Sequence, residues 1–340
     1  MELETMILGP HELDKAAQLL QAGKCVAFPT ETVYGLGANA LDPEAVKAIF
    51  TAKGRPQDNP LIVHCYSQKQ VREVVSEIPP KAQTLMNRFW PGPLTLVLPK
   101  GDLIPPVVSA GLDTVAVRIP DHPVALALLE KADIPVAAPS ANVSGRPSPT
   151  RAEHVLFDLG GRIGAVVDGG ETGWGVESTV LDCTTTPFRI LRPGGITLEK
   201  LREVTDVEVD PGVYGPAHTK PRSPGMKYKH YAPDADVYLI VGEGTPAKIR
   251  ELGEHYKRLG RRVGVMAVTE HISLYSDFTV LDMGSKLALQ EISSRLYHLL
   301  REVDRTGIEV LLVEGVSEEH LGMAIMNRLR KAASNQVVQT

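Results

Sequence analysis

The sequence predicts an α/β protein with a mixed sheet in a large first domain and a second, smaller α/β domain. Short apolar runs alternate with helical stretches through the first part of the chain. A proline-rich stretch from Asp210 to Pro233 interrupts this pattern, and the alternation resumes after it. At 340 residues the chain is also long for one domain, so two domains are expected.

The first domain is predicted to begin with a helix over residues 11–22, in which apolar residues recur at helical spacing and Gly23 follows the end. Further helices are predicted over 43–52, 80–90, 122–131 and 151–159. Thr150 and Glu153 form a candidate capping box for the last of them. Strands are predicted at 26–28, 61–64, 94–98, 115–119, 136–138, 165–167, 179–181 and 189–191. Some follow one another too closely for a helical crossover, so a mixed sheet is expected.

The smaller domain is predicted from three more strands and three more helices. The strands are expected at 237–241, 263–268 and 309–313, and the helices at 246–259, 286–304 and 320–333. The predicted organisation is therefore a first domain over 1–208, a linker over 209–233 and a second domain over 234–340. A linker of this length is usually functional or disordered. Its basic and aromatic residues 227–231 are a candidate lid over an active site, and Tyr231 is expected to lie closest to the reacting groups.

Composition limits the classes of protein that this chain resembles. The formal net charge of −5 supplies no overall basic field, so any contact with RNA would have to be local. The three cysteines form no C-x-x-C pair, which argues against a disulfide framework or a zinc site, and Cys25 and Cys65 are expected in the core. The start of the chain is acidic, and no apolar stretch approaches membrane length. A cytoplasmic enzyme with no membrane partner is predicted.

Two short polar clusters suit an anionic ligand such as a nucleotide. Lys53 and Arg55 flank a glycine just after a predicted helix, and Ser140 and Asn142 follow a buried strand. Each cluster also has a purely structural explanation. Cations and glycine are common at helix ends, and Ser and Asn are common in turns. The chain contains no Walker A loop, so a phosphate-binding P-loop is not predicted.

Other motifs support a ligand site at strand ends more weakly. Residues 35–40 match G-x-G-x-x-A in form, but no helix follows the glycines directly, so we expect close backbone packing there instead of a dinucleotide site. Thr30, His64 and Arg118 all end apolar runs, and ligands collect at strand ends in open α/β sheets. Ser178 lies in no G-x-S-x-G elbow, so it is not predicted to be a nucleophile.

Together, seven segments resemble the threonylcarbamoyl-AMP synthase family in its long, two-domain form. They are residues 26–36, 53–56, 59–64, 90–95, 138–142, 175–179 and 223–233. The resemblance covers essentially the whole chain, and no motif position departs from it. It implies a twisted open mixed sheet around a large, positively lined cavity, with a smaller, Rossmann-like α/β domain after the linker. It also implies a nucleotidyltransferase that converts L-threonine, bicarbonate or CO2, and ATP to threonylcarbamoyl-AMP and pyrophosphate for tRNA modification.

The resemblance implies a role for each site residue. Lys53 and Arg55 would be catalytic, acting on the phosphates, and both are expected to face solvent in the empty cavity. The ATP site would comprise Lys53, Arg55, Asn59, Thr114, Ser140, Asn142, Ser148, Arg192 and Tyr231. The threonine site would comprise Thr30, His64, Arg118, Ala138 and Ser178. Mg2+ would arrive on the ATP, with no protein ligands predicted. No general base stands out, and the sequence leaves the choice between CO2 and bicarbonate open.

Two other classes of function remain open. An RNA-binding module is suggested by the basic residues Lys220, Arg222, Lys227 and Lys229, although the charge of −5 and the aromatic content of 5% count against it. A carbamoyl- or acyl-transfer enzyme could use the same cavity. Direct binding of tRNA or of tRNA-modification proteins is a further possible partnership.

Overall fold

A computed structural model of the chain describes residues 4–214 and 231–340. Contacts divide it into two compact units, one formed by residues 1–144 and 148–227 and the other by 145–147 and 228–340. We describe each unit by itself. The linker predicted over 209–233 stays a prediction, because residues 215–230, including most of the candidate lid, lie outside the described residues.

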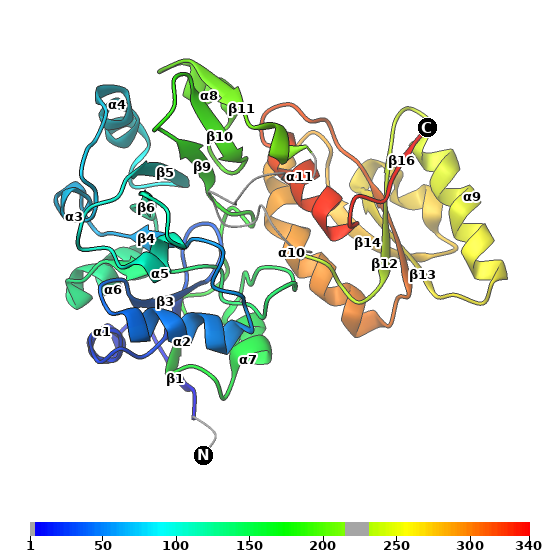
Figure 1. Ribbon diagram of the computed structural model, residues 1–340. Coiled ribbons are helices and arrows are strands. Elements are labelled where there is room, and N and C mark those ends of the chain that lie inside the picture. The colour runs from blue at the N-terminus through cyan, green and yellow to red at the C-terminus, as the bar shows by residue number, and fades with distance from the viewer. Residues whose placement is uncertain (1–3, 215–230) are drawn as a thin grey trace. The chain divides into compact units, whose positions relative to one another are not determined.

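The first unit is built on an eleven-stranded sheet in the described residues. Figure 1 shows helices lying against several of its labelled strands. Its strand order is β1-β8-β2-β3-β7-β4-β6-β5-β9-β10-β11, with parallel and antiparallel pairs mixed along it. The strands are β1 (Met6–Leu8), β2 (Val26–Phe28), β3 (Gly35–Asn39), β4 (Ile62–His64), β5 (Leu94–Pro99), β6 (Thr114–Arg118), β7 (Val136–Ala137), β8 (Ala165–Val167), β9 (Thr179–Asp182), β10 (Phe188–Arg192) and β11 (Val207–Val209). The predicted fold class is confirmed.

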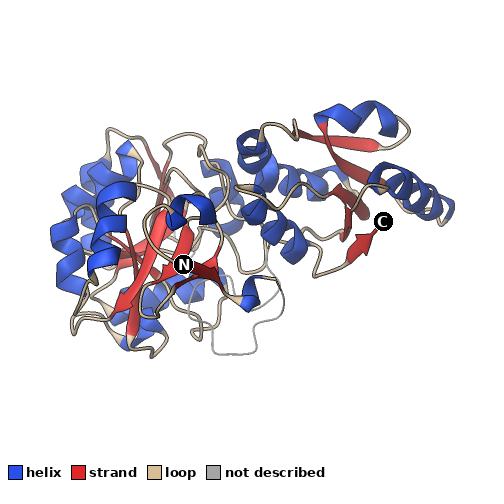
Figure 2. Cartoon of the chain, turned by 90° about the horizontal axis from the view of Figure 1, so that it is seen from above, coloured by secondary structure: helices blue, strands red, loops and turns tan. Residues whose placement is uncertain are grey.

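Helices pack beside this sheet, as the view in Figure 2 shows. They are α1 (Leu13–Gln21), α2 (Pro43–Lys53), α3 (Gln68–Val74), α4 (Pro80–Phe89), α5 (Pro106–Ser109), α6 (Pro123–Ala132), α7 (Ala152–Leu159) and α8 (Leu198–Arg202), followed by the short 3-10 helix η1 (Pro211–Val213). Helix α2 shows why the sequence sets its ends. Asp42 caps it by accepting from the Glu44 N–H, and Gly54 at φ 59° takes the left-handed conformation that ends it.

Alternation along the central strands separates the core from the candidate site. Leu61 and Val63 on one strand, and Val115 and Val117 on its neighbour, enter the main core. The residues between them point to the other face of the sheet. That face carries a small apolar cluster, made of Ile62, Val97, Ala116, Val180 and Leu191, together with polar side chains. The main core also contains Cys25 and Cys65, as predicted.

One strand was not predicted, and one local prediction needs correction. Residues 35–39 form strand β3, where a Cβ on Gly37 would lie 2.7 Å from Phe28 and 2.8 Å from Val136, so the glycine permits close packing as expected. The capping box proposed for α7 is wrong. Arg151 is the N-cap residue, and the Thr150 N–H donates to His154 Nδ1 instead, at 3.3 Å.

The second unit has a five-stranded parallel sheet in the described residues, in the order β14-β13-β15-β12-β16. Its elements are β12 (Asp236–Val241), α9 (Thr245–Arg258), β13 (Val263–Val268), the 3-10 helix η2 (Thr269–Tyr275), β14 (Thr279–Gly284), α10 (Leu289–Thr306), β15 (Val310–Glu314), α11 (Gly322–Ala332) and β16 (Val337–Gln339). The second α/β domain is therefore confirmed as an architecture. No helix among the described residues is long and apolar enough to cross a membrane.

Candidate active site

Strands β4 and β6 bring two predicted threonine-site residues together. The strands are parallel neighbours in which His64 pairs with Arg118, so both side chains share the face opposite the main core. Thr114 shares that face but begins β6, about 13 Å from Arg118 at ~3.3 Å per residue. Ala138 donates its N–H to Ile62 O at 2.8 Å beside them.

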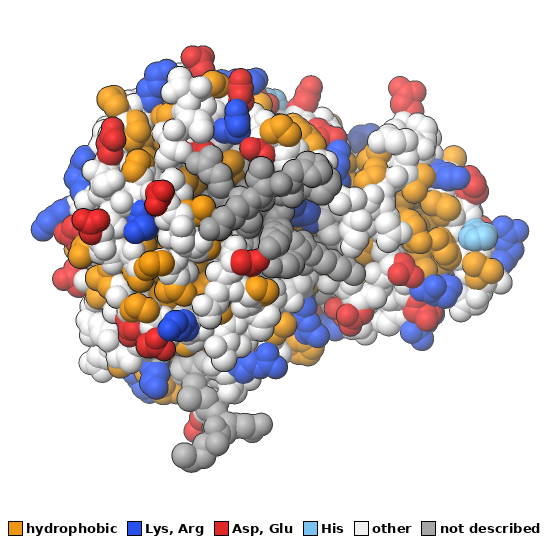
Figure 3. All heavy atoms as spheres, in the orientation of Figure 1, with side chains coloured by type: hydrophobic (Ala, Val, Ile, Leu, Met, Phe, Trp, Pro, Cys, Tyr) orange, Lys and Arg blue, Asp and Glu red, His pale blue; other side chains and the backbone are white. Residues whose placement is uncertain are grey.

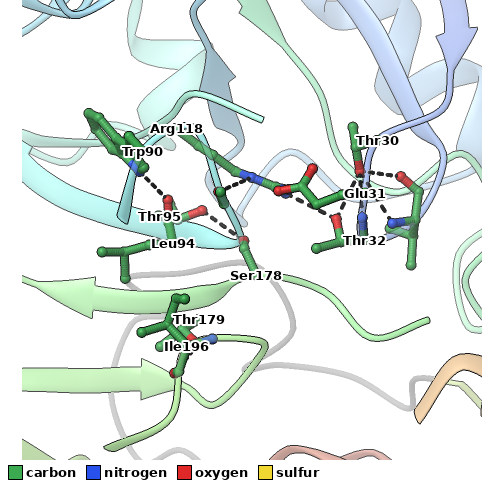
Figure 4. Close-up of polar contacts among 12 residues, drawn as sticks. Thr30, Glu31, Thr32, Trp90, Leu94, Thr95, Arg118, Ser178, Thr179 and Ile196 are labelled. Atoms are coloured by element: carbon green, nitrogen blue, oxygen red, sulfur yellow. Dashed lines mark hydrogen bonds and ion pairs between the residues drawn. The ribbon is translucent and has the colours of Figure 1, made fainter. Parts of the chain in front are cut away.

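Arg118 is held by polar contacts from three directions. It is 3% exposed, and Figure 4 shows it reaching from β6 toward Glu31 and Thr32. Its Nη2 lies 2.5 Å from Oε1 of Glu31, its Nη1 donates to Thr32 Oγ1 at 3.1 Å, and its Nε donates to Gly92 O at 3.3 Å. A guanidinium held from three directions is well suited to present a fixed charge to a carboxylate.

His64 is a neutral neighbour of this cation. It is 4% exposed and its ring meets the ring of Phe28 edge-on at 6.2 Å. Burial, and then the charge of Arg118, lower the pKa of His64 from 6.5 to about 3. The imidazole is therefore uncharged at neutral pH, and it can hydrogen-bond a ligand without adding positive charge.

Thr30 lies in a tight turn after β2. Its Oγ1 donates to Val33 O at 2.6 Å, lies 2.8 Å from Thr32 Oγ1, and accepts from the N–H groups of Thr32 and Val33. These bonds fix the turn that carries Glu31 and Thr32 to Arg118. The sequence interpretation missed both residues, although they lie within the quoted segment 26–36.

Ser178 connects the two predicted ligand sets. Its hydroxyl lies 2.8 Å from Thr95 Oγ1, and Thr95 precedes Leu96, which pairs with Val117 next to Arg118. Arg192 Nη2 donates to Ser178 Oγ at 3.2 Å, and its Nε and Nη2 donate to Ser178 O at 3.1 and 3.0 Å. A residue predicted to bind ATP therefore touches one predicted to bind threonine.

Ser148 is fully buried and donates to Oε1 of Glu177 at 2.6 Å. Glu177 is itself 6% exposed and directly precedes Ser178, so the predicted ATP residue Ser148 is tied to the same loop. The sequence interpretation did not single out Glu177, because an isolated glutamate in a glycine-rich loop gives no signal of burial.

Lys53 is placed differently from the prediction that it faces solvent in an empty cavity. It is 2% exposed, and its Nζ donates to Ser140 O and Asn142 O, each at 2.5 Å. The backbone adds a further tie, because the Ser144 N–H donates to Lys53 O at 3.0 Å. The prediction is wrong because the Lys53 ammonium donates to two backbone carbonyls and so fixes the 140–144 loop.

Arg55 is half-buried. Its Nη2 donates to Asn59 O at 3.4 Å, and its guanidinium lies 6.0 Å from the ring centre of Phe50. Asn59 is 1% exposed, so the loop from Gly54 to Pro60 is anchored at its far end. Lys53 therefore places one cation against the Ser140–Asn142 segment, and Arg55 follows it two residues later on the anchored loop.

Backbone bonds join this segment to the turn that carries Glu31. Gly35 forms a bridge with Ser140, the Ala141 N–H donates to Tyr34 O at 2.9 Å, and the Leu36 N–H donates to Pro139 O at 2.8 Å. The fold therefore places Ser140 and its neighbours beside the segment that follows the turn of Thr30. It leaves Thr114 at the opposite end of β6 from Arg118.

Tyr231 belongs to the second unit. Its side chain is 5% exposed, its ring lies 5.1 Å from that of Tyr297, and the guanidinium of Arg328 lies 5.7 Å from its centre. Its proposed contact with ATP stays a prediction. Among the described residues no group of three or more His, Cys, Asp or Glu side chains is arranged to hold a metal ion.

Comparison with known proteins gives one consistent family. Residues 18–194 match the family described as "Telomere recombination", and residues 196–334 match "Threonylcarbamoyl-AMP synthase, C-terminal domain". The chain is 51% identical to the threonylcarbamoyl-AMP synthase of Pyrococcus abyssi over 95% of its length and 94% of that protein. It is also 51% identical to the Bacillus subtilis enzyme of the same name, over 96% and 94%. The solved structure of P. abyssi Sua5 complexed with L-threonine superposes with a TM-score of 0.94 at 48% identity, covering 99% of this chain and all of that one. The chain therefore belongs to the threonylcarbamoyl-AMP synthase family, in its two-domain form.

Proposed function

We propose that this protein converts L-threonine, bicarbonate or CO2, and MgATP to threonylcarbamoyl-AMP and pyrophosphate. The observation that carries the proposal is the similarity to threonylcarbamoyl-AMP synthases along nearly the whole chain. The meeting of the motif residues on adjoining segments of the first unit supports it. The finer class, a nucleotidyltransferase, follows from the transfer of AMP to a carbamate oxygen.

The threonine site is proposed around Arg118. Its fixed guanidinium suits the substrate carboxylate, which a bidentate contact would hold by charge-assisted hydrogen bonds. The hydroxyls of Thr32 and Ser178 and the neutral imidazole of His64 offer partners for the threonine hydroxyl without adding charge. A P. abyssi relative has been solved in complex with L-threonine, which supports threonine as the ligand.

The phosphates are proposed to lie along the loops that Lys53 and Arg55 join. The carbamate oxygen attacks the α-phosphorus in line, the bond from that phosphorus to the bridging oxygen breaks, and pyrophosphate leaves. Such chemistry depends on positioning and charge stabilisation. Arg55 would contact the phosphates directly. Lys53 would fix the Ser140–Asn142 segment and supply positive charge behind it. Mg2+ enters as part of the nucleotide substrate.

The test is a reconstitution with the purified full chain, L-threonine, bicarbonate and MgATP. We expect pyrophosphate to appear with a product of the mass of threonylcarbamoyl-AMP, and both to require threonine and bicarbonate. Pyrophosphate release that does not depend on threonine, or does not depend on bicarbonate, would contradict the proposal.

The alternative of an RNA-binding module has less support. The face drawn in Figure 3 shows basic and acidic side chains interspersed over its described residues. The linker cations that suggested the module lie outside the described residues. Salt-sensitive tRNA binding without any threonine-dependent pyrophosphate would favour it. Direct contact with tRNA and a cytoplasmic location stay predictions.

A further inference from the structure

The carboxylate of Glu31 is buried and makes few polar contacts. The residue is 8% exposed, and its Oε1 faces Nη2 of Arg118 at 2.5 Å. Within the part of the chain that the structure describes, neither of its carboxylate oxygens has a hydrogen-bond partner, and Nη2 of Arg118 has none either. Buried polar atoms are nearly always hydrogen-bonded, so this pair needs an explanation. A buried ion pair is also weak as a device for stability alone.

The pair places opposite charges side by side among the residues that the proposed function assigns to threonine. A free amino acid carries an ammonium group and a carboxylate on one carbon atom, so it can satisfy both members of the pair at once. The carboxylate of the amino acid would accept hydrogen bonds from Arg118, and its ammonium group would donate hydrogen bonds to Glu31. The Thr30 and Thr32 hydroxyls lie in the same turn, as Figure 4 shows.

We propose that Glu31 binds the α-ammonium group of threonine and accepts a proton from it. This inference rests on the proposed function. One N–H bond breaks, and its proton moves to a carboxylate oxygen of Glu31, leaving a lone pair on nitrogen. That pair forms the N–C bond with carbon dioxide, and the second N–H proton leaves to water as the carbamate forms. With bicarbonate, hydroxide leaves the carbon atom and departs with that proton as water.

Two groups on other elements face Glu31. Arg118 faces Glu31 from β6. His122 lies at the start of α6, and its imidazole interacts electrostatically with Glu31. Burial lowers the pKa of His122 and, more strongly, that of His64 beyond Arg118. Arg118 therefore supplies the fixed positive charge next to Glu31 at neutral pH. A proton that Glu31 receives is not contributed by either imidazole.

The first test replaces Glu31 with Gln, which keeps the shape but cannot take the proton. We expect turnover at saturating threonine to fall about 100-fold or more, the range for a lost general base. The residual rate should rise roughly tenfold per pH unit through mildly alkaline pH, as the free amine of threonine becomes more abundant, while the wild-type profile stays flatter. Glu31→Asp, which keeps the acid, should retain the wild-type profile at a reduced rate. The exposed ion-pair residue Glu203 supplies the matched control Glu203→Gln, which should behave as wild type.

The second test needs no variant. Calorimetry on the wild-type chain should show threonine binding at least tenfold more tightly than 3-hydroxybutanoate, the same molecule without its amine. Equal affinities would overturn the inference, as would a Glu31→Gln enzyme with the wild-type rate and pH profile. If the wild type makes no pyrophosphate from threonine, bicarbonate and ATP, the proposed function fails, and the binding comparison still decides whether an ammonium group is recognised.

Discussion

Removing Arg118 should damage stability and threonine recognition by separable amounts. The change Arg118→Met deletes the guanidinium and leaves the Glu31 carboxylate buried without its ion-pair partner. Breaking a buried pair in this way costs about 3–5 kcal/mol of unfolding free energy. At 2–4 °C per kcal/mol for a domain of this size, the melting temperature should drop roughly 6–20 °C. Adding Glu31→Gln removes the stranded charge, so the double variant should recover most of that loss.

Threonine recognition should not recover with it. Loss of a charge-assisted carboxylate contact costs on the order of 2–4 kcal/mol, which corresponds to a rise of about 30- to 1,000-fold in the threonine requirement. The ATP requirement should stay near the wild-type value in the double variant. The assays are thermal denaturation of both variants and pyrophosphate release with each substrate varied in turn. A double variant no more stable than Arg118→Met, or equal losses for threonine and ATP, would refute this reasoning.

Four other substitutions test contacts described above. Lys53→Met should lower both the melting temperature and the rate, because it frees the clamped carbonyls, whereas the half-buried Arg55→Ala should slow pyrophosphate release by roughly 10²-fold with little change in stability. Identical effects of the two would contradict their different placement. His64 stays neutral in the folded state and gains a proton on unfolding below pH 6.5, so stability falls as pH drops from 6.5 toward 3. The free energy of unfolding should therefore be measured at pH 7 and at pH 5, and between them His64→Gln should lose about 2 kcal/mol less of it than the wild type loses. Equal losses in the two proteins would contradict the lowered pKa of His64. Gly37→Ala should destabilise the first unit by about 1–3 kcal/mol, since its Cβ would overlap Phe28, and an unchanged melting temperature would count against that packing.

The sequence was sufficient for most elements because their signals are local. Helix α2, for example, carries its cap, its apolar face and its terminal glycine within one short stretch. Strand β3 was missed because its glycines gave it the appearance of a loop, and only the close approach of Phe28 and Val136 explains them. One pairing partner, β2, directly precedes it along the chain, but the other, β7, comes from a distant part of the sequence.

The candidate site was predictable in its residue types and less so in its contacts. Arg118 and His64 stand at strand ends that an apolar pattern marks. The burial of Lys53 depends on the Ser140–Asn142 segment, which lies 87 or more residues away along the chain. The partner of Glu31 is equally remote in sequence. Such pairings are set by the register of the sheet, and no local pattern encodes them.

The alternation along β6 restricts how this protein can change in length. Val117 points into the core and Arg118 to the opposite face, so deleting or inserting one residue within Thr114–Arg118 would exchange them. A valine would then replace the guanidinium, and a charge would enter the main core. A point substitution in β6 changes one side chain, but a one-residue change of length would move every following side chain to the opposite face. Natural variation in chain length should therefore fall in connections such as residues 100–113, outside the central strands.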